Sequence, residues 1–196
     1  MLKMDDKRNR VCPVSMAGSL DNKLRLWLQD PKRILQPYVK EGMIVLDLGC
    51  GPGFFSVALA EMVGESGRVI AADMQEGMLQ KLRDKIQGTK IEDRITLHKC
   101  EGDRINVTEH VDFALAFYMV HEVPDQIPFF KELISILKPT GQFLIVEPKL
   151  FHVSKKAFGN TVNNAKIAGF KTAGGPKVLF SRSVILQSAN GCTAQP

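Results

Sequence analysis

The chain has few cysteines, one tryptophan and no long apolar run, and these shortages exclude several classes of protein. Its cysteines lie far apart, without Cys-x-x-Cys or Cys/His ligand spacing, so neither a disulfide framework nor a zinc site is indicated. No segment has the roughly 18 uninterrupted apolar residues of a membrane span, and no apolar signal core follows the charged residues 1–10. We therefore expect a cytoplasmic protein with free thiols, no metal site and no membrane segment. The four cysteines are Cys12, Cys50, Cys100 and Cys192.

Positive charge is in modest excess and is spread along the chain. The formal net charge is +5, and small basic clusters occur only at residues 3–10 and 155–156. A nucleic-acid-binding surface typically shows a stripe of Lys and Arg, which the linear sequence lacks. The charge pattern therefore favours an ordinary solvated surface over an RNA footprint.

The most informative stretch is VLDLGCGPGFFS, residues 45–56. An apolar run carries Asp47 near its end, Gly49, Gly51 and Gly53 then alternate with other residues, and a helix-compatible run follows. This order predicts a strand, a tight turn and a helix. Because glycine has no Cβ, it adopts positive φ readily and lets a ligand lie against the main chain, near the unbonded N–H groups of the helix start.

Glycine spacing argues against a nicotinamide dinucleotide as the ligand. The dinucleotide fingerprint requires a further glycine, to seat the pyrophosphate on the helix, at the position that Phe54 occupies. A second acid, Asp73, ends the next apolar run, about 20 residues after the turn, where a carboxylate can accept hydrogen bonds from both hydroxyls of a ribose. The pattern therefore retains a ribose contact and disfavours a dehydrogenase.

Counted from Asp47, the pattern acid-x-Gly-x-Gly-x-Gly resembles the first motif of class I S-adenosylmethionine (SAM) dependent methyltransferases. Residues 111–122 resemble the fourth strand of that family and the loop that touches SAM and substrate. Residues 137–148 resemble its fifth strand, and residues 176–187 resemble the hairpin of its sixth and seventh strands. The resemblance is nearest the small-molecule branch typified by ubiquinone and menaquinone biosynthesis methyltransferases.

Helices and strands alternate along the chain, which predicts a parallel sheet covered on both faces. Together with the resemblance, this gives an α/β, Rossmann-like three-layer sandwich with a mostly parallel seven-stranded sheet and a C-terminal antiparallel hairpin. Three parts are expected: an N-terminal tail and helical lid at 1–40, a SAM-binding core at 41–187 and a flexible tail at 188–196. The expected elements before the hairpin are helices 20–28 and 31–39, strand 44–48, helix 54–62, strand 69–72, helix 77–87, strands 95–99 and 113–117, helix 125–137 and strand 142–147.

The resemblance also implies which residues hold the cofactor. Asp47 and the glycines lie under the methionine part of SAM, Asp73 holds the ribose, and Met74 either packs on the adenine or belongs to the core. The adenine amino group meets an acid after the third strand, for which Glu101 and Asp103 compete; the Gly-Asp pair favours Asp103. The full expected set is Asp47, Gly49, Gly51, Gly53, Asp73, Met74, Cys100, Glu101, Asp103 and Phe117.

Catalytic chemistry is expected in the loop after the fourth strand. The protein has mainly to align the acceptor and exclude water, and a base is needed only where the acceptor must lose a proton. His121 is the candidate base because imidazole titrates near neutrality, and Tyr118 or Glu122 could assist. Two other roles for His121 stay open: it could line the acceptor pocket, or it could brace the turn.

The substrate cover is slender in this sequence. Residues 149–170 leave room for one helix, so the lid must come mainly from residues 11–39 and could enclose a small acceptor or leave an open cleft. We expect a SAM-dependent methyltransferase acting on a small molecule; an RNA or protein methyltransferase and a SAM-binding module without turnover are the alternatives. A soft metalloid bound by Cys12 or Cys100 is a further alternative. The expected lining of the lid is Leu20, Asp21, Asn22, Arg25 and Trp27.

Overall fold

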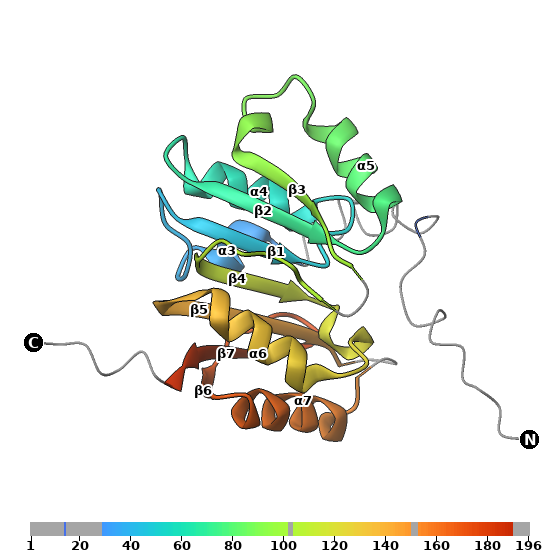
Figure 1. The fold of residues 1–196 in the computed structure, drawn as a ribbon, viewed down its shortest axis with the longest axis vertical. Helices are drawn as coiled ribbons and strands as arrows, with labels where there is room; N and C mark the ends of the chain where they lie inside the picture. Colours follow the sequence, from blue (N-terminus) through green and yellow to red (C-terminus); the bar gives the residue numbers. More distant parts are fainter. Residues whose placement is uncertain (1–13, 15–28, 102–103, 150–152, 190–196) are drawn as a thin grey trace, which may run out of the picture.

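A seven-stranded sheet forms the centre of the molecule, in the order β3-β2-β1-β4-β5-β7-β6 (Figure 1). The computed structural model describes residues 14, 29–101, 104–149 and 153–189. The strands are β1 (Ile44–Leu48), β2 (Arg68–Asp73), β3 (Ile95–Lys99), β4 (Val111–Phe117), β5 (Leu137–Pro148), β6 (Phe170–Gly174) and β7 (Ser181–Ser188). The helices are α3 (Pro31–Leu35), α4 (Phe54–Val63), α5 (Glu76–Ile86), α6 (Gln126–Ile136) and α7 (Lys155–Ile167), with short 3-10 turns η3 (Glu92–Arg94) and η4 (Val120–Glu122).

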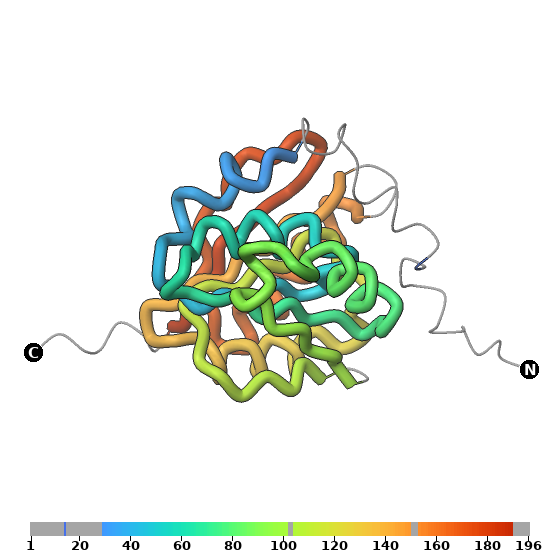
Figure 2. The backbone as a smooth tube through the Cα atoms, turned by 90° about the horizontal axis from the view of Figure 1, so that it is seen from above, coloured from blue at the N-terminus to red at the C-terminus, as the bar shows by residue number. Residues whose placement is uncertain are grey.

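The sheet is parallel except at its C-terminal edge. β1 pairs in parallel with β2 and β4, β2 with β3, and β4 with β5, whereas β7 runs antiparallel to both β5 and β6. Helices α3, α4 and α5 cover one face, and α6 and α7 cover the other (Figure 2). The expected class, a Rossmann-like three-layer sandwich with a mostly parallel seven-stranded sheet, is confirmed.

Two apolar layers follow from side-chain alternation along the central strands. In β1, Val45 packs with the α3–α5 layer, while Leu46 and Leu48 pack with the α6–α7 layer. Successive side chains of a strand point to opposite faces, so a strand covered by helices on both sides reads as an almost continuous apolar run. Between β3 and β4 the described residues form no helix; Ile105 and Val107 fill that part of the second layer instead.

One carboxylate joins the amino ends of the three central strands. Asp112, at the start of β4, accepts a hydrogen bond from the Ile44 amide at 2.9 Å and from the Lys138 Nζ at 2.7 Å. Its partners belong to β1 and β5, so the three central strands are fixed at their starts. None of the helices within the described ranges is both long and apolar enough to cross a bilayer.

Three expected boundaries differ from the structure. The helix expected at 31–39 ends at Leu35. Pro37 has no amide hydrogen, so the series of helical hydrogen bonds stops there, although Gln36 still has helical backbone angles. The hairpin expected at 176–187 was placed too late: β6 is Phe170–Gly174, and residues 176–187 contain only the connection and most of β7. β5 begins at Leu137 rather than 142, with a register irregularity opposite the start of β4. The helix expected at 20–28 and all but the first residues of the expected tail lie outside the described residues.

Truncating a central core residue tests this layering. Leu115 on β4 is fully buried, so Leu115→Ala should lower the free energy of unfolding by about 2–5 kcal/mol, measured by urea denaturation. The same truncation at Leu179, which is 49% exposed, should change it by less than about 0.5 kcal/mol. Similar losses for the two variants would contradict the core position of β4.

Candidate functional site

The site lies at the carboxyl ends of β1 and β4, where the strand order reverses. Leu48 of β1 pairs with Ala116 of β4, although β2 and β3 lie between these strands in the sequence. In open α/β sheets, ligands bind in the crevice that forms at such a reversal. A glycine turn, residues 49–53, follows β1 at this point, and η4 follows β4.

The three glycines of this turn adopt the left-handed backbone conformation. Their φ angles are 65° at Gly49, 54° at Gly51 and 84° at Gly53. A Cβ at Gly53 would clash with the side chain of Leu82, so the turn lies against α5 there. A Cβ at Gly51 would meet nothing within 4 Å, so the main chain at Gly51 faces open space. The middle of the turn is therefore the part that a ligand can approach closely.

Asp73, at the end of β2, fastens this turn. Its Oδ2 accepts the Gly51 amide at 2.9 Å, and its Oδ1 accepts the Gln75 amide at 2.8 Å. Burial raises the pKa of Asp73, while hydrogen bonds from the backbone N–H groups of Gln75, Gly51 and Met74 lower it in part. Each carboxylate oxygen has two lone pairs, so the group keeps acceptor capacity beyond these bonds.

Asp47 is a residue of β1, two positions before the first glycine of the turn. The side chain is buried, and its Oδ2 accepts the Ser56 hydroxyl at 2.6 Å. Ser56 belongs to the first turn of α4, so this bond ties the middle of the sheet to the start of the helix.

The residues around the end of β3 are partly brought together. The Cys100 amide donates to the Asp73 carbonyl at 3.0 Å, and Met74 is 46% exposed beside them. Glu101 is exposed and forms an isolated bridge with Arg104. Asp103 lies outside the described residues, so the choice between Glu101 and Asp103 stays a prediction.

Both described cysteines keep their protons at neutral pH. Burial, together with the charges of Asp73 and Glu132, raises the pKa of Cys100 to about 11, and burial also raises the pKa of Cys50 well above its ordinary value. A thiol binds soft ligands as the thiolate, so neither position is prepared for that chemistry. Cys12 lies outside the described residues. Within the described ranges, no group of three or more His, Cys, Asp or Glu side chains could hold a metal ion.

The loop after β4 lies directly against the glycine turn. A Cβ at Gly49 would be only 2.9 Å from the Cβ of Met119, so this glycine allows the two segments to touch. Just before the loop, Phe117 is buried with its ring centroid 4.3 Å from that of Phe55 on α4. Phe117 therefore packs against the start of α4, the helix that follows the glycine turn.

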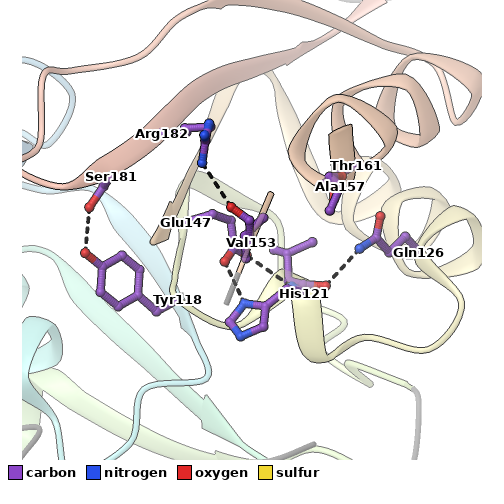
Figure 3. A network of polar contacts seen from close by, with 10 residues as sticks. Tyr118, His121, Gln126, Glu147, Val153, Ala157, Thr161, Ser181 and Arg182 are labelled. Atoms are coloured by element: carbon purple, nitrogen blue, oxygen red, sulfur yellow. Dashed lines mark hydrogen bonds and ion pairs between the residues drawn. The ribbon is translucent and has the colours of Figure 1, made fainter. Parts of the chain in front are cut away.

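Tyr118 has a strained backbone and a fully engaged hydroxyl. Its φ is 64°, an uncommon value for a residue other than glycine, and its amide donates to the Val146 carbonyl at 2.8 Å. The hydroxyl shares a hydrogen bond of 2.5 Å with Ser181 (Figure 3). It also accepts one of 2.7 Å from the side chain of Gln29. These bonds join β7, the segment before α3 and the loop after β4.

His121, on η4, forms two hydrogen bonds with one buried acid. Its Nδ1 is 2.6 Å from Oε2 of Glu147, and its amide donates to Oε1 of the same residue at 3.1 Å (Figure 3). Glu147 is 1% exposed, whereas the His121 side chain is 27% exposed. Burial by itself lowers the pKa of His121, but the hydrogen bond and charge of Glu147, aided by Glu122, raise it above the ordinary value.

Glu147 is the site residue that the sequence analysis missed. The available signal was its position inside FLIVEP, a run that otherwise consists of strand-forming apolar residues and a final proline. A charged residue in a fully buried strand requires a partner, and this one finds it in His121, 26 positions away.

Comparison with known proteins identifies the family. The methyltransferase domain matches residues 39–177. The chain belongs to this family, the class I SAM-dependent methyltransferases. A SAM-dependent methyltransferase from Aquifex aeolicus resembles it with a TM-score of 0.79 and 28% identity, covering 90% of this chain and 98% of that one. Demethylmenaquinone methyltransferase from Lactobacillus johnsonii is 32% identical over an alignment of 152 residues; the match covers 69% of this chain but only 62% of that protein.

The fold itself is shared more widely. The fibrillarin pre-rRNA processing protein of Methanococcus jannaschii has a TM-score of 0.62 at 16% identity, covering 79% of this chain and 69% of that one. That likeness concerns architecture alone. Membership of the class I family implies S-adenosyl-L-methionine as the cofactor.

The open space over Gly51 allows a precise substitution test. Gly51→Ala should lower SAM affinity at least about tenfold in calorimetry, because the new methyl group occupies space that the cofactor needs and overpacking costs about 1–3 kcal/mol. Gly88→Ala is the matched control: Gly88 also has positive φ and open space, but it lies in the turn after α5. Equal SAM affinities in the two variants would argue that the cofactor lies elsewhere.

The second substitution removes the carboxylate at the end of β2. Asp73→Ala should reduce SAM affinity at least about tenfold, because each lost hydrogen bond to a charged group costs about 1.5–3 kcal/mol. Asp112→Ala removes a carboxylate at the start of β4, at the end of the strands opposite the site, and should leave the affinity unchanged. Calorimetry on folded samples of both variants makes the comparison, and unaltered binding by Asp73→Ala would refute a ribose contact.

Proposed function

We propose that this protein transfers a methyl group from SAM to a small-molecule acceptor. The observation that carries the proposal is the glycine turn, whose main chain at Gly51 is open and bonded to the Asp73 carboxylate, while Gly49 lies against Met119, just before η4. The relatives named as demethylmenaquinone methyltransferases support a small, quinone-like acceptor, although the aligned residues span less than two thirds of their length.

The residues present fit SAM. Open backbone at Gly51 accommodates the methionine part, the spare acceptor capacity of Asp73 suits two ribose hydroxyls, and the exposed Met74 side chain suits an adenine face. SAM carries no phosphate, so Phe54 after the last glycine is no obstacle. The cofactor supplies a methyl group on a sulfonium, an electrophile that needs no activation by the protein.

The chain's own residues orient the acceptor and keep water out. We place the acceptor beside η4, where His121 is half-buried and Tyr118 forms a wall through its bonds to Gln29 and Ser181. Among the residues described between β5 and β6, α7 is the one helix, and this short connection leaves no room for a large substrate module. In this proposal residues 41–187 form the SAM-binding core; most of the expected lid and tails, at 1–40 and 188–196, lies outside the described residues.

A two-stage experiment tests this function. Calorimetry should detect SAM and S-adenosylhomocysteine and no NAD, because the turn lacks the third fingerprint glycine. Labelled SAM should then transfer its methyl group to a component of a small-metabolite extract and leave total RNA and a protein lysate unlabelled.

The outcomes separate the alternatives. Label in RNA or protein would replace the small-molecule acceptor with a macromolecule. Tight SAM binding without label in any fraction would favour a binding module without turnover, and NAD binding without SAM binding would overturn the cofactor assignment.

A further inference from the structure

Glu147 is a buried carboxylate whose two hydrogen bonds both go to the loop after β4. Both of its oxygens are directed to one residue, with Oε1 on the His121 amide and Oε2 on the His121 ring. The other two buried acids of the site bond to the glycine turn and to the helix after it: Asp73 accepts from the Gly51 amide, and Asp47 accepts from Ser56 in the first turn of α4. Glu147 serves only the loop on the acceptor side.

The bond to Glu147 decides which ring nitrogen of His121 carries the proton. A carboxylate can only accept, so Nδ1 donates to it and the lone pair of the neutral ring resides on Nε2. The second bond, to the amide, fixes the backbone from which the ring projects. The pair thus holds one tautomer in one orientation, the arrangement that a general base requires.

The position of the pair favours the acceptor over the cofactor as its target. Met119, two residues before His121, lies against the glycine turn at Gly49, so the loop that carries His121 adjoins the turn that we propose holds the cofactor. The His121 side chain is 27% exposed while Glu147 is 1% exposed, so a ligand reaches the imidazole and not the acid.

We propose that Glu147 is a positioning residue that makes His121 the general base for an acceptor bearing a weakly acidic hydroxyl, such as a phenol or an enol. This inference rests on the proposed methyl transfer. Base assistance matters for a hydroxyl whose pKa lies above that of imidazole, since a thiol ionises more readily and a neutral amine attacks without prior loss of a proton.

The step balances without a further reactant. The acceptor oxygen gives its proton to Nε2 of His121, and an oxygen electron pair forms the new bond to the methyl carbon. The bond from that carbon to the cofactor sulfur breaks, and its electron pair stays on sulfur. The positive charge lost from sulfur appears on the imidazolium, next to Glu147, and the proton then passes to water.

Within the described part of the chain, the charged groups near the imidazole come from β5, η4, β7 and α7. β5 contributes Glu147, and η4 itself contributes Glu122. Arg182 of β7 lies opposite Glu147 in register, but its Nη1 donates to the Val153 carbonyl at 3.0 Å. α7 packs against η4 as well, and its charged residues are all exposed. These residues are Lys155, Lys156 and Lys166. The anionic partner that the imidazolium contacts is therefore Glu147.

The first test reads the tautomer directly and needs no acceptor. In ¹⁵N-histidine-labelled protein saturated with S-adenosylhomocysteine, NMR should show His121 protonated at Nδ1, with a pKa above that of an ordinary histidine. Its signal is assigned by its loss in His121→Gln, since the chain has four histidines. Glu147→Gln should mix the tautomers and lower the pKa, because the negative charge is gone.

A matched control exists at the opposite ends of the strands, where β4 begins. Asp112 accepts one backbone amide and one side-chain nitrogen, as Glu147 does, so Asp112→Asn makes the same change of acid to amide away from the loop. It should leave the His121 titration and the methyl transfer rate unchanged. Thermal denaturation of both variants separates a loss of folding from a loss of positioning.

The second test follows the reaction with the acceptor purified by the labelled-methyl screen. His121→Gln should lower kcat by about a hundredfold or more, and Glu147→Gln by at least about tenfold, with SAM affinity unchanged in both. In the wild type, kcat/KM should rise with pH as His121 loses its proton. Because Glu147 raises the pKa of His121, Glu147→Gln should move that rise to lower pH.

The outcomes distinguish this inference from the proposed function. A product methylated on oxygen, together with the Nδ1-protonated tautomer, supports the inference. A product methylated on nitrogen or sulfur, an Nε2-protonated His121, or full activity in folded Glu147→Gln protein overturns it and leaves methyl transfer intact. Absence of SAM binding in the wild type removes the proposed function itself.

Discussion

The hydrogen bond from the Gly51 amide to the Asp73 carboxylate is the interaction on which the cofactor side of the site depends. It joins the turn after β1 to the end of β2 and so fixes a backbone to which glycine gives wide conformational freedom. Because the turn has no side chains at its glycine positions, its shape must be imposed from outside. Asp73 on one side and Leu82 beneath Gly53 provide that shape.

The two halves of the site differ in the groups that line them. The half next to β2 consists of main chain held by carboxylates, with a geometry set by the sheet. The half next to β5 consists of side chains, His121 and Tyr118, held by partners on β5 and β7. A backbone cradle suits a cofactor that every member of a family shares, whereas side chains can vary with the acceptor.

The sequence was sufficient for features with a local cause. The glycine turn and the bounds of β1 and β3 follow from residue type and apolar runs, and the fold class follows from their order. Non-local features were less accessible. β6 was misplaced because its edge position leaves only Phe170 buried, so its apolar signal is weak, and the Glu147–His121 pair depends on the register between neighbouring strands. Proline effects on α3 were local but were overlooked.

Tyr118 gives this arrangement a mechanical property. Its hydroxyl is bonded to Gln29 and to Ser181, and its backbone lies three residues before His121. A displacement of the segment that leads into α3 must therefore either break the bond from Gln29 or pull on the loop that carries His121. The phenol ring of Tyr118 therefore couples the position of the segment before α3 to that of the loop that carries His121.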